Sequence, residues 1–283
     1  MTAIRKDAAA PALMRNGDYQ IVSGRVQTRS LEAHIVDHCN LRCWGCCSLS
    51  PYLPKWCVDP ADLERDLRLA RRALAPQYFK LVGGEPLLHP ALDECLAIAR
   101  RSEIAPVVSV TTDGFMLPRA SEQFWRLAQA LTISLYAHPA LPIETTALVA
   151  RRAAEHAIPI NWKRQGQFVD MDLDERREDA TVTRNIYADC WLRRRCHIVS
   201  RGRFFTCTRP PHFETFFGAD AGFLDDGVVL EEGPEMAARL LAYLQKPEPL
   251  NACLLCQGGN APTRPHRQMS PEEVESTARR RRQ

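Results

Sequence analysis

Residues 31–48, LEAHIVDHCNLRCWGCCS, join a run of apolar and β-branched residues to a group of four cysteines. The first seven residues are predicted to form a β-strand, because Ile and Val favour strands. The thiols of Cys39, Cys43, Cys46 and Cys47 follow directly where that strand ends. A strand that leads into chemically reactive side chains predicts a functional loop at one edge of a sheet.

Strand-like runs alternate with amphipathic stretches after this point, which is typical of a parallel sheet covered by helices. The further predicted strands are residues 78–82, 107–112, 131–136 and 158–163. The predicted helices are residues 59–74, 90–102, 118–130 and 142–156. The fold class is therefore α/β, a partial (β/α) TIM-like barrel of about five to six parallel strands.

The composition is that of an ordinary globular protein, with 283 residues, 45% hydrophobic and 25% charged. This length favours one large domain with an appendage, and the net charge of +3 gives no bulk argument for binding nucleic acid. The N-terminal residues lack a signal peptide and no run is long enough to span a membrane, so we expect a cytoplasmic protein. In that compartment the eleven cysteines favour metal ligands or buried thiols over disulfides.

Unusual residues gather at the carboxyl ends of the predicted strands, where the working groups of such barrels lie. They are GGEP (83–86), TTDG (111–114), Ser134 with Tyr136, and Asn161 with Lys163. Each of them alone is also compatible with a plain turn or a structural hydroxyl. Together with the cysteines they predict one functional rim.

The cysteine spacing points to an iron–sulfur cluster. Cys39, Cys43 and Cys46 form C-x3-C-x2-C, which differs from the paired C-x2-C of structural zinc sites. An iron–sulfur cube takes one thiolate per iron, so three cysteines leave one iron open to another ligand. Cys47 is surplus to the cube, and we predict that it is a small buried residue.

The motif CNLRCWGC (39–46) followed by GGEP (83–86) resembles the radical S-adenosylmethionine (SAM) superfamily, and the resemblance extends over the five predicted strands. It implies that the three cysteines hold a [4Fe–4S] cluster whose open iron binds SAM. Reductive cleavage of SAM would then give a 5′-deoxyadenosyl radical that takes a hydrogen atom from a substrate.

The resemblance also implies contacts with SAM. The implied residues are Gly83, Gly84, Glu85, Pro86, Thr111, Thr112 and Ser134. Glu85 would either hold the ammonium of SAM or brace the barrel. The residue before the third cysteine is often aromatic in this family and lies near adenine. Here it is Gly45, with Trp44 just before it, so Trp44 is the candidate for this contact.

A second set of cysteines lies after the predicted strands. Residues 197–207, HIVSRGRFFTC, are predicted to form a β-hairpin with Gly202 in the turn. The order of Cys, Gly, Cys and a later C-x2-C resembles the twitch domain, a shortened SPASM extension of some radical SAM barrels. This implies an auxiliary [4Fe–4S] cluster held by Cys190, Cys207, Cys253 and Cys256. A zinc site is the alternative.

The other cysteines have no predicted cofactor role. Cys196 is the spare thiol of the second set, and Cys57 and Cys95 are predicted to be packing residues. The resulting expected domains are an N-terminal extension (1–30), a barrel core (31–170), a twitch-like domain (171–260) and a basic tail (261–283). The tail is expected to be poorly ordered or an exposed helix, and DMDLDE (170–175) to be a surface loop.

In size and layout the chain most resembles radical SAM dehydrogenases of aminocyclitol and sugar pathways. This implies oxidation of an alcohol, with the auxiliary cluster as electron acceptor and a flavodoxin or ferredoxin as electron donor. The candidate proton acceptors are Lys163, Tyr136, Arg164 and His138. Epimerisation, decarboxylation, peptide modification and a two-cluster electron carrier remain as alternatives.

Arginines around the predicted hairpin bear on the substrate. They are Arg193, Arg194, Arg195, Arg201, Arg203 and Arg209. Such a group indicates either a small anionic substrate, such as a nucleotide sugar or sugar acid, or a solvated hairpin. We expect a monomer with a small-molecule substrate and with no nucleic-acid or membrane partner.

Overall fold

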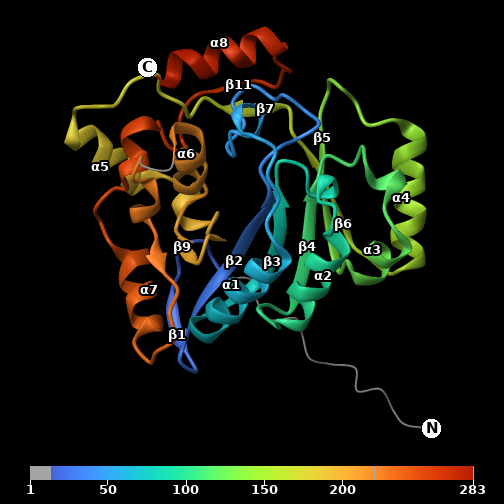
Figure 1. Ribbon diagram of the computed structural model, residues 1–283, viewed down its shortest axis with the longest axis horizontal. Coiled ribbons are helices and arrows are strands. Elements are labelled where there is room, and N and C mark those ends of the chain that lie inside the picture. The colour runs from blue at the N-terminus through green and yellow to red at the C-terminus, as the bar shows by residue number, and fades with distance from the viewer. Residues whose placement is uncertain (1–13, 219–220, 283) are drawn as a thin grey trace.

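The computed structural model describes residues 14–218 and 221–282, and its central layer is one large sheet (Figure 1). The strand order is β10-β9-β8-β2-β3-β4-β5-β6. Its parallel strands are β8 (Ile198–Ser200), β2 (Arg25–Val36), β3 (Leu74–Gly83), β4 (Val107–Thr112), β5 (Ala130–Leu135) and β6 (Ile160–Arg164). The predicted α/β partial barrel is confirmed.

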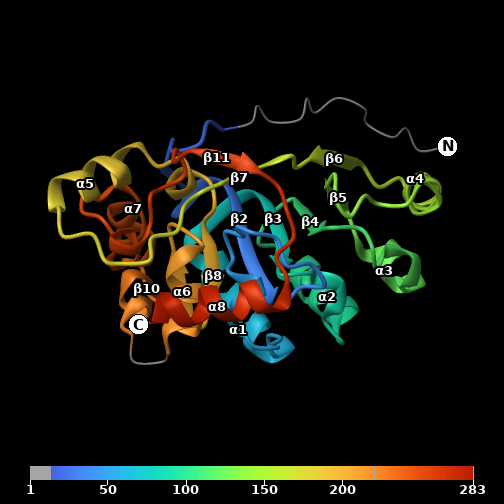
Figure 2. The ribbon, with the colours of Figure 1, turned by 90° about the horizontal axis from the view of Figure 1, so that it is seen from above.

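Antiparallel strands extend this sheet and form a small second one. The additions to the main sheet are β1 (Gln20–Val22) beside β2, then β9 (Arg203–Phe205) and β10 (Val228–Val229). The separate sheet pairs β7 (Gln167–Val169) with β11 (Thr263–Pro265), and these two strands lie side by side in Figure 2.

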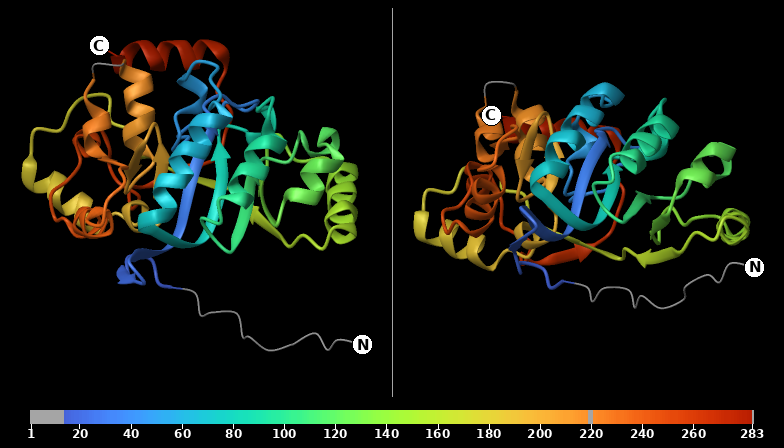
Figure 3. Two further views of the ribbon diagram at one scale, coloured as in Figure 1. Left: turned by 60° about the horizontal axis from the view of Figure 1, so that its bottom comes forward. Right: turned by 90° about the horizontal axis from the view of Figure 1, so that it is seen from below.

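Helices cover the outer face of the barrel and build its C-terminal side. The first group is α1 (Pro60–Ala73), α2 (Leu92–Arg101), α3 (Glu122–Leu127) and α4 (Ile143–Glu155). The second group is α5 (Ala180–Asp189), α6 (Arg209–Phe217), α7 (Met236–Gln245) and α8 (Pro271–Arg282). Short 3-10 turns span Ser50–Tyr52, Pro86–Leu88, Leu117–Arg119, Leu192–Arg194, Phe223–Asp226 and Asn251–Leu255. Figure 3 shows α1 and α2, in light blue and teal, along the outer face of β2 and β3.

Helix α1 illustrates why the sequence folds in this way. Asp59 caps the helix by accepting a hydrogen bond from the backbone N–H of Ala61 at 2.8 Å, and Pro60 occupies the first turn. Leu63 and Leu67 are buried one turn apart, so one apolar stripe faces the sheet. The third predicted helix is shorter than expected, because Ser121 caps the start of α3, where its Oγ accepts a hydrogen bond from Phe124 N at 2.8 Å.

The predicted hairpin is present, and it continues the barrel. Arg201 and Gly202 have φ of 54° and 70°, the left-handed geometry of a tight turn between β8 and β9. Strand β8 pairs in parallel with β2. Asp66 of α1 accepts a hydrogen bond from Gly202 N at 2.9 Å. The hairpin is therefore joined to the barrel through both the sheet and a helix.

The C-terminal residues are better ordered than a loose tail. Helix α8 has no buried residue, in agreement with the exposed-helix alternative, and lies across the top of the molecule in Figure 1. Residues 263–270, in contrast, lie against the cysteine loop, and Met269 is buried. None of the described helices is both long and apolar enough to cross a lipid bilayer.

Candidate functional site

A cavity of about 520 Å³ lies inside the barrel, and most of the predicted rim lines it. Of the residues singled out above, its wall includes Cys39, Cys43, Cys46, Cys47, Gly83, Gly84, Thr111, Thr112, Ser134, Tyr136, Asn161, Lys163, Arg195 and Cys196. Trp44, Glu85, Pro86, His138 and Arg164 are not among the lining residues. The carboxyl ends of neighbouring parallel strands meet at one edge, which explains why the rim could be predicted.

Gly83 and Gly84 allow β3 to approach the end of β2. A Cβ atom on Gly84 would lie 1.9 Å from the carbonyl oxygen of His38, and one on Gly83 would lie 2.2 Å from that of Val36. The backbone N–H of Gly84 donates to Val36 O at 2.7 Å. Only glycine fits at these two positions, so the GGEP motif has a structural reason in addition to any contact with a ligand.

Glu85 braces the barrel and does not face the cavity. Its carboxylate is fully buried and accepts hydrogen bonds from Thr112 Oγ1 at 2.7 Å, Asp113 N at 2.8 Å and Leu87 N at 3.0 Å. Burial, followed by the charge of Asp113, raises the pKa of Glu85 above its usual value. These contacts therefore fit the alternative in which Glu85 braces the barrel.

Asp113 is a lining residue that the sequence reasoning did not select. Its Oδ1 accepts a hydrogen bond from Phe115 N at 3.0 Å. Its Oδ2 is buried and has no hydrogen-bond partner among the described residues. An acidic residue directly after a strand, within TTDG, was the signal that could have identified it. An unpaired carboxylate oxygen at the cavity wall suits a cationic group such as an ammonium.

The cysteine loop is covered by residues 266–269. The side-chain amide of Gln268 donates to Cys43 Sγ at 3.2 Å, and His266 Nε2 lies 3.2 Å from the same sulfur. The backbone N–H of Met269 donates to Arg42 O at 2.8 Å. Cys43 therefore has polar neighbours from a segment more than 220 residues away in sequence.

An aromatic group stands beside this loop, and it differs from the one predicted. Phe168 of β7 lies against Gly45, where a Cβ atom would meet the Phe168 Cβ at 3.5 Å. Phe168 and Tyr136 both line the cavity, and the ring of His266 stacks on Tyr136 with centroids 4.5 Å apart. Trp44 is instead covered by the guanidinium of Arg264, 5.3 Å from its ring centre.

Cys39, Cys43 and Cys46 of the motif line the cavity together and are the candidate cluster ligands. No group of three or more His, Cys, Asp or Glu side chains in residues 14–218 and 221–282 is arranged to hold one metal ion. A cube takes one thiolate per iron and does not require the thiols to converge on one point. Burial raises the pKa of Cys43 to about 11 and that of Cys46 to about 12, so binding a cluster through thiolates must release protons.

The auxiliary cysteines meet in one small pocket. Cys190, Cys207, Cys253 and Cys256 all line it, whereas Cys196 lies in the barrel cavity. Backbone N–H groups donate to three of the sulfurs. The pairs are Gly259 N to Cys190 at 3.2 Å, Gly258 N to Cys256 at 3.3 Å and Arg209 N to Cys207 at 3.4 Å. Such donors suit thiolate ligands. The free space in this pocket is about 20 Å³, so a cluster would require the four side chains to turn apart.

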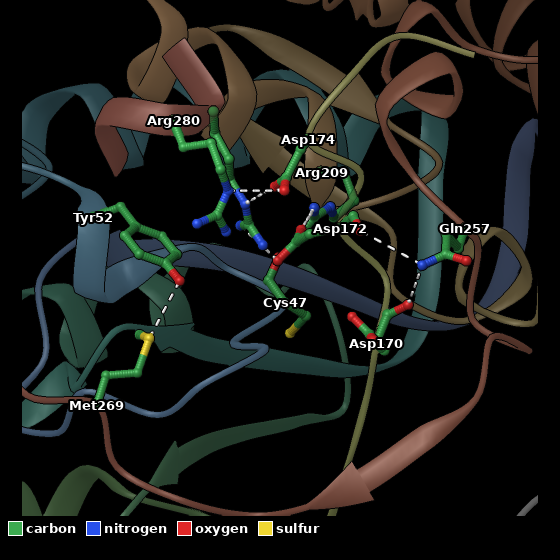
Figure 4. A network of polar contacts seen from close by, with 10 residues as sticks. Cys47, Tyr52, Asp170, Asp172, Asp174, Arg209, Gln257, Met269 and Arg280 are labelled. Atoms are coloured by element: carbon green, nitrogen blue, oxygen red, sulfur yellow. Dashed lines mark hydrogen bonds and ion pairs between the residues drawn. The ribbon is translucent and has the colours of Figure 1, made fainter. Parts of the chain in front are cut away.

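Arg209 lines the auxiliary pocket and contacts Cys47 and Asp172, which are drawn in Figure 4. Its Nη1 donates to Cys47 O at 3.1 Å, and its Nη2 forms an ion pair with Asp172. Asp172 also pairs with Arg281 of α8 at 2.8 Å. The prediction of a surface loop at 170–175 is thus wrong for Asp172, whose side chain is only 6% exposed.

The two arginines control the charge of Asp172. Burial alone would raise the pKa of this carboxyl group, but the charges of Arg209 and Arg281 outweigh it and hold the pKa below its usual value. Arg209 is itself 1% exposed, and its Nε has no hydrogen-bond partner among the described residues. The ion pair therefore joins the cysteine loop, the auxiliary pocket and the C-terminal helix.

No family model matches the chain, but part of it is similar to curated proteins. The GTP 3',8-cyclase of Mycobacterium marinum is 35% identical over 120 residues, which cover 41% of this chain and 33% of that protein. The GTP 3',8-cyclase of Microcystis aeruginosa is 31% identical over 112 residues, 37% of this chain and 33% of that protein. The chain thus spans about a third of the length of these relatives.

Solved structures are similar over a larger part of the chain, at low sequence identity. BtrN in complex with AdoMet and 2-DOIA gives a TM-score of 0.45 at 13% identity, covering 80% of this chain and 84% of BtrN. Streptococcus suis SuiB bound to S-adenosylmethionine gives a TM-score of 0.39 at 12% identity, covering 65% of this chain and 61% of SuiB.

Proposed function

We propose a function for this chain on the premise that it belongs to the radical SAM superfamily. The proposed function is removal of a hydrogen atom from a small, sugar-like or anionic substrate, followed by oxidation of its alcohol to a carbonyl. The observation that carries the proposal is that Cys39, Cys43 and Cys46 share one cavity wall with the glycine edge of β3 and the polar ends of β4 and β5.

Two clusters and SAM are the cofactors of this proposal. Cys39, Cys43 and Cys46 would hold the first [4Fe–4S] cluster, and Cys190, Cys207, Cys253 and Cys256 would hold the auxiliary one. When bound, the first cluster and SAM supply a 5′-deoxyadenosyl radical, and the auxiliary cluster accepts the electron that leaves the substrate. Gln268 donates to Cys43, and hydrogen bonds of this kind tune the potential of a cluster.

The residues of the cavity wall would orient SAM. Asp113 offers an unpaired carboxylate oxygen to its ammonium, with Thr111, Thr112 and Ser134 nearby for its other polar groups. Glu85 acts indirectly, because it fixes Thr112 and the backbone of Asp113 by hydrogen bonds. Phe168 offers an aromatic face beside Gly45 to the adenine, a contact worth about 1–3 kcal/mol for a stacked base.

The proton acceptor for the alcohol is assigned to Glu32, which lines the cavity. Burial raises the pKa of Glu32, but Lys80 and His34 outweigh this effect and keep it below its usual value. The carboxylate is therefore ionised at neutral pH and can accept the hydroxyl proton. Burial raises the pKa of Tyr136, so its phenol stays protonated and donates a hydrogen bond. Arg164 and His138 are not part of the cavity wall.

The localisation, oligomeric state and electron donor of the protein are also part of the proposal. We expect a cytoplasmic monomer that receives single electrons from a flavodoxin or a ferredoxin. A reducing environment with little oxygen suits clusters that are held by thiolates.

Anaerobic reconstitution tests the proposed function. We expect about eight irons per chain, four for each cube, and formation of 5′-deoxyadenosine when SAM and a strong reductant are added. A reconstituted protein with about four irons and one zinc per chain would contradict the proposed auxiliary cluster. A fully reconstituted protein that forms no 5′-deoxyadenosine would refute the enzyme function and favour the alternative of a two-cluster electron carrier.

Epimerisation is a second candidate, and Cys196 favours it. Its thiol lines the same cavity, and burial raises its pKa well above the usual value, so the S–H bond is retained. Transfer of that hydrogen to a substrate radical would form a C–H bond and a thiyl radical, which an electron from the auxiliary cluster and a proton would return to the thiol. Reaction in D₂O separates the two functions, since only epimerisation places solvent deuterium on the product carbon.

A further inference from the structure

The auxiliary pocket lies directly beside the barrel cavity. Leu192 lines both spaces, and Thr208, which lines the cavity, follows Cys207 of the pocket in the chain. The two spaces therefore share a wall at Leu192. Such an arrangement suits the transfer of an electron from a substrate in the cavity to a cluster in the pocket.

Tyr187, in the last turn of α5, lines the auxiliary pocket and carries a hydroxyl group without a partner. The residue is 2% exposed, and its Oη has no hydrogen-bond partner among the described residues. A buried hydroxyl without a hydrogen bond costs free energy, so most such groups in native proteins meet an acceptor. A phenol has a usual pKa of about 10 and keeps its proton at neutral pH, so this group is available as a donor.

The cysteine sulfurs of the pocket lie near this phenol. Cys190 follows Tyr187 by three residues, and its backbone N–H donates to Tyr187 O at 3.3 Å. Burial raises the pKa of Tyr187 to about 12, and the charge of Arg193 opposes this effect. Negative charge on Cys253 and Cys207 raises the pKa further, so the phenol is close enough to these two sulfurs to interact with them.

Arg209 supplies a second unpaired donor at the same pocket. Its backbone N–H donates to Cys207 Sγ at 3.4 Å, and its buried Nε has no hydrogen-bond partner among the residues that the structure describes. Burial raises the pKa of Cys256, and the positive charge of Arg209 acts against this. The pocket thus offers side-chain donors in addition to the backbone N–H groups. A [4Fe–4S] cube has sulfides as well as thiolates to accept them, whereas a zinc site has thiolates alone.

We propose that the Tyr187 hydroxyl donates a hydrogen bond to the auxiliary cluster and thereby raises its reduction potential. This inference rests on the proposed function. There, the 5′-deoxyadenosyl radical takes the hydrogen atom from the carbinol carbon, Glu32 takes the hydroxyl proton, and the remaining electron reduces the auxiliary cluster. That electron adds one negative charge to the cluster. A hydrogen bond stabilises the more negative form more strongly, so Tyr187 favours electron flow from the substrate radical to the cluster.

Tyr187→Phe tests the inference, because it removes only the hydroxyl. The ring stays, and with it the contact of the Arg193 guanidinium, 3.9 Å from the ring centre. A potentiometric titration followed by electron paramagnetic resonance is made on the reconstituted chain with both clusters. It is repeated in a Cys43→Ala background, which is expected to keep only the auxiliary cluster. The ratio of reduced to oxidised auxiliary cluster at a fixed potential should fall about tenfold, which for one electron is about 59 mV.

Tyr243→Phe is the matched control, because Tyr243 is also buried but is not among the residues that line the pocket. Its hydroxyl donates to Asp226 O at 2.6 Å and accepts from Thr206 N at 3.1 Å. Its removal should lower the melting temperature of the metal-free protein and leave the cluster potential unchanged. Tyr187→Phe should do the reverse, since its hydroxyl has no partner to lose within the described part of the chain.

The outcomes separate the inference from the proposed function. A lower potential in Tyr187→Phe alone, with the stability of the metal-free protein retained, supports the hydrogen bond. An unchanged potential, or an equal shift in Tyr243→Phe, would overturn it even if the protein forms 5′-deoxyadenosine. Failure to form 5′-deoxyadenosine would refute the proposed function instead, because the potential is measured without SAM. Zinc in place of the auxiliary cluster would contradict both.

Discussion

Replacing Arg209 by methionine tests whether the buried ion pair holds the two cysteine sites together. Methionine keeps most of the volume and removes the charge. The side chains of Arg209 and Asp172 are 2% and 6% exposed, so the pair is shielded from water. Removing one partner of a buried pair costs about 3–5 kcal/mol. Asp172 keeps Arg281 at 2.8 Å, so we expect a value near the lower end, about 3 kcal/mol.

Thermal unfolding measures this loss. For a chain of this size each kcal/mol corresponds to about 2–4 °C, so the melting temperature should fall by about 6–12 °C. Arg280→Met is the matched control, because Arg280 makes the same type of ion pair with Asp174 at 2.8 Å but is 57% exposed. An exposed pair contributes about 0–1 kcal/mol. Equal, small losses in both variants would refute the role assigned to Arg209.

The pH dependence gives a second reading of the same pair. The pKa of Asp172 is held below its usual value in the folded protein, so its contribution is present above the unfolded pKa of about 4. The contribution is lost as the pH falls through the folded pKa. The difference in stability between wild type and Arg209→Met should therefore be full at pH 7 and shrink below about pH 4. A difference that grows in acid would contradict this account.

Four further substitutions address the site. Cys43→Ala should abolish 5′-deoxyadenosine formation and lower the iron content by about half, as measured by iron analysis. Cys253→Ala should also remove about four irons but keep some SAM cleavage while blocking net oxidation, which product analysis detects. Phe168→Ala should weaken SAM binding about fivefold to a hundredfold in equilibrium dialysis, and a loss confined to Trp44→Ala would assign the adenine contact to Trp44 instead. Gly84→Ala should unfold at a lower temperature than wild type, because its Cβ would lie 1.9 Å from His38 O.

The sequence alone was sufficient to predict the barrel and most of the rim residues that line its cavity. Periodicity identified the strands, and the strand 107–112 has the expected bounds in β4. The carboxyl ends of parallel strands must share an edge, so residues as far apart as Cys39 and Lys163 could be assigned to one cavity. The resemblance to the twitch domain grouped the four auxiliary cysteines, and they do meet in one pocket.

What the sequence could not provide were contacts between distant segments. Nothing in the local pattern of residues 170–175 indicates that Asp172 is buried, because its partners Arg209 and Arg281 are 37 and 109 residues away. Phe168 replaces Trp44 beside the cavity for a similar reason, since β7 is positioned by its pairing with β11. Lys163 and Arg164 are neighbours on β6, and successive side chains of a strand point to opposite faces, so only one of the two could line the cavity, and it is Lys163.

The segment that covers the cysteine loop has a consequence for how the protein is made. Gln268 reaches Cys43 across 225 residues of sequence, so the ribosome completes the barrel long before it supplies this contact. Domains generally begin to fold from the N-terminal side during synthesis. Cys43 therefore lacks this cover until residues 266–269 have been made, and we expect the proposed cluster to enter more easily before they cover it. Iron delivered before that point would be enclosed when β11 pairs with β7.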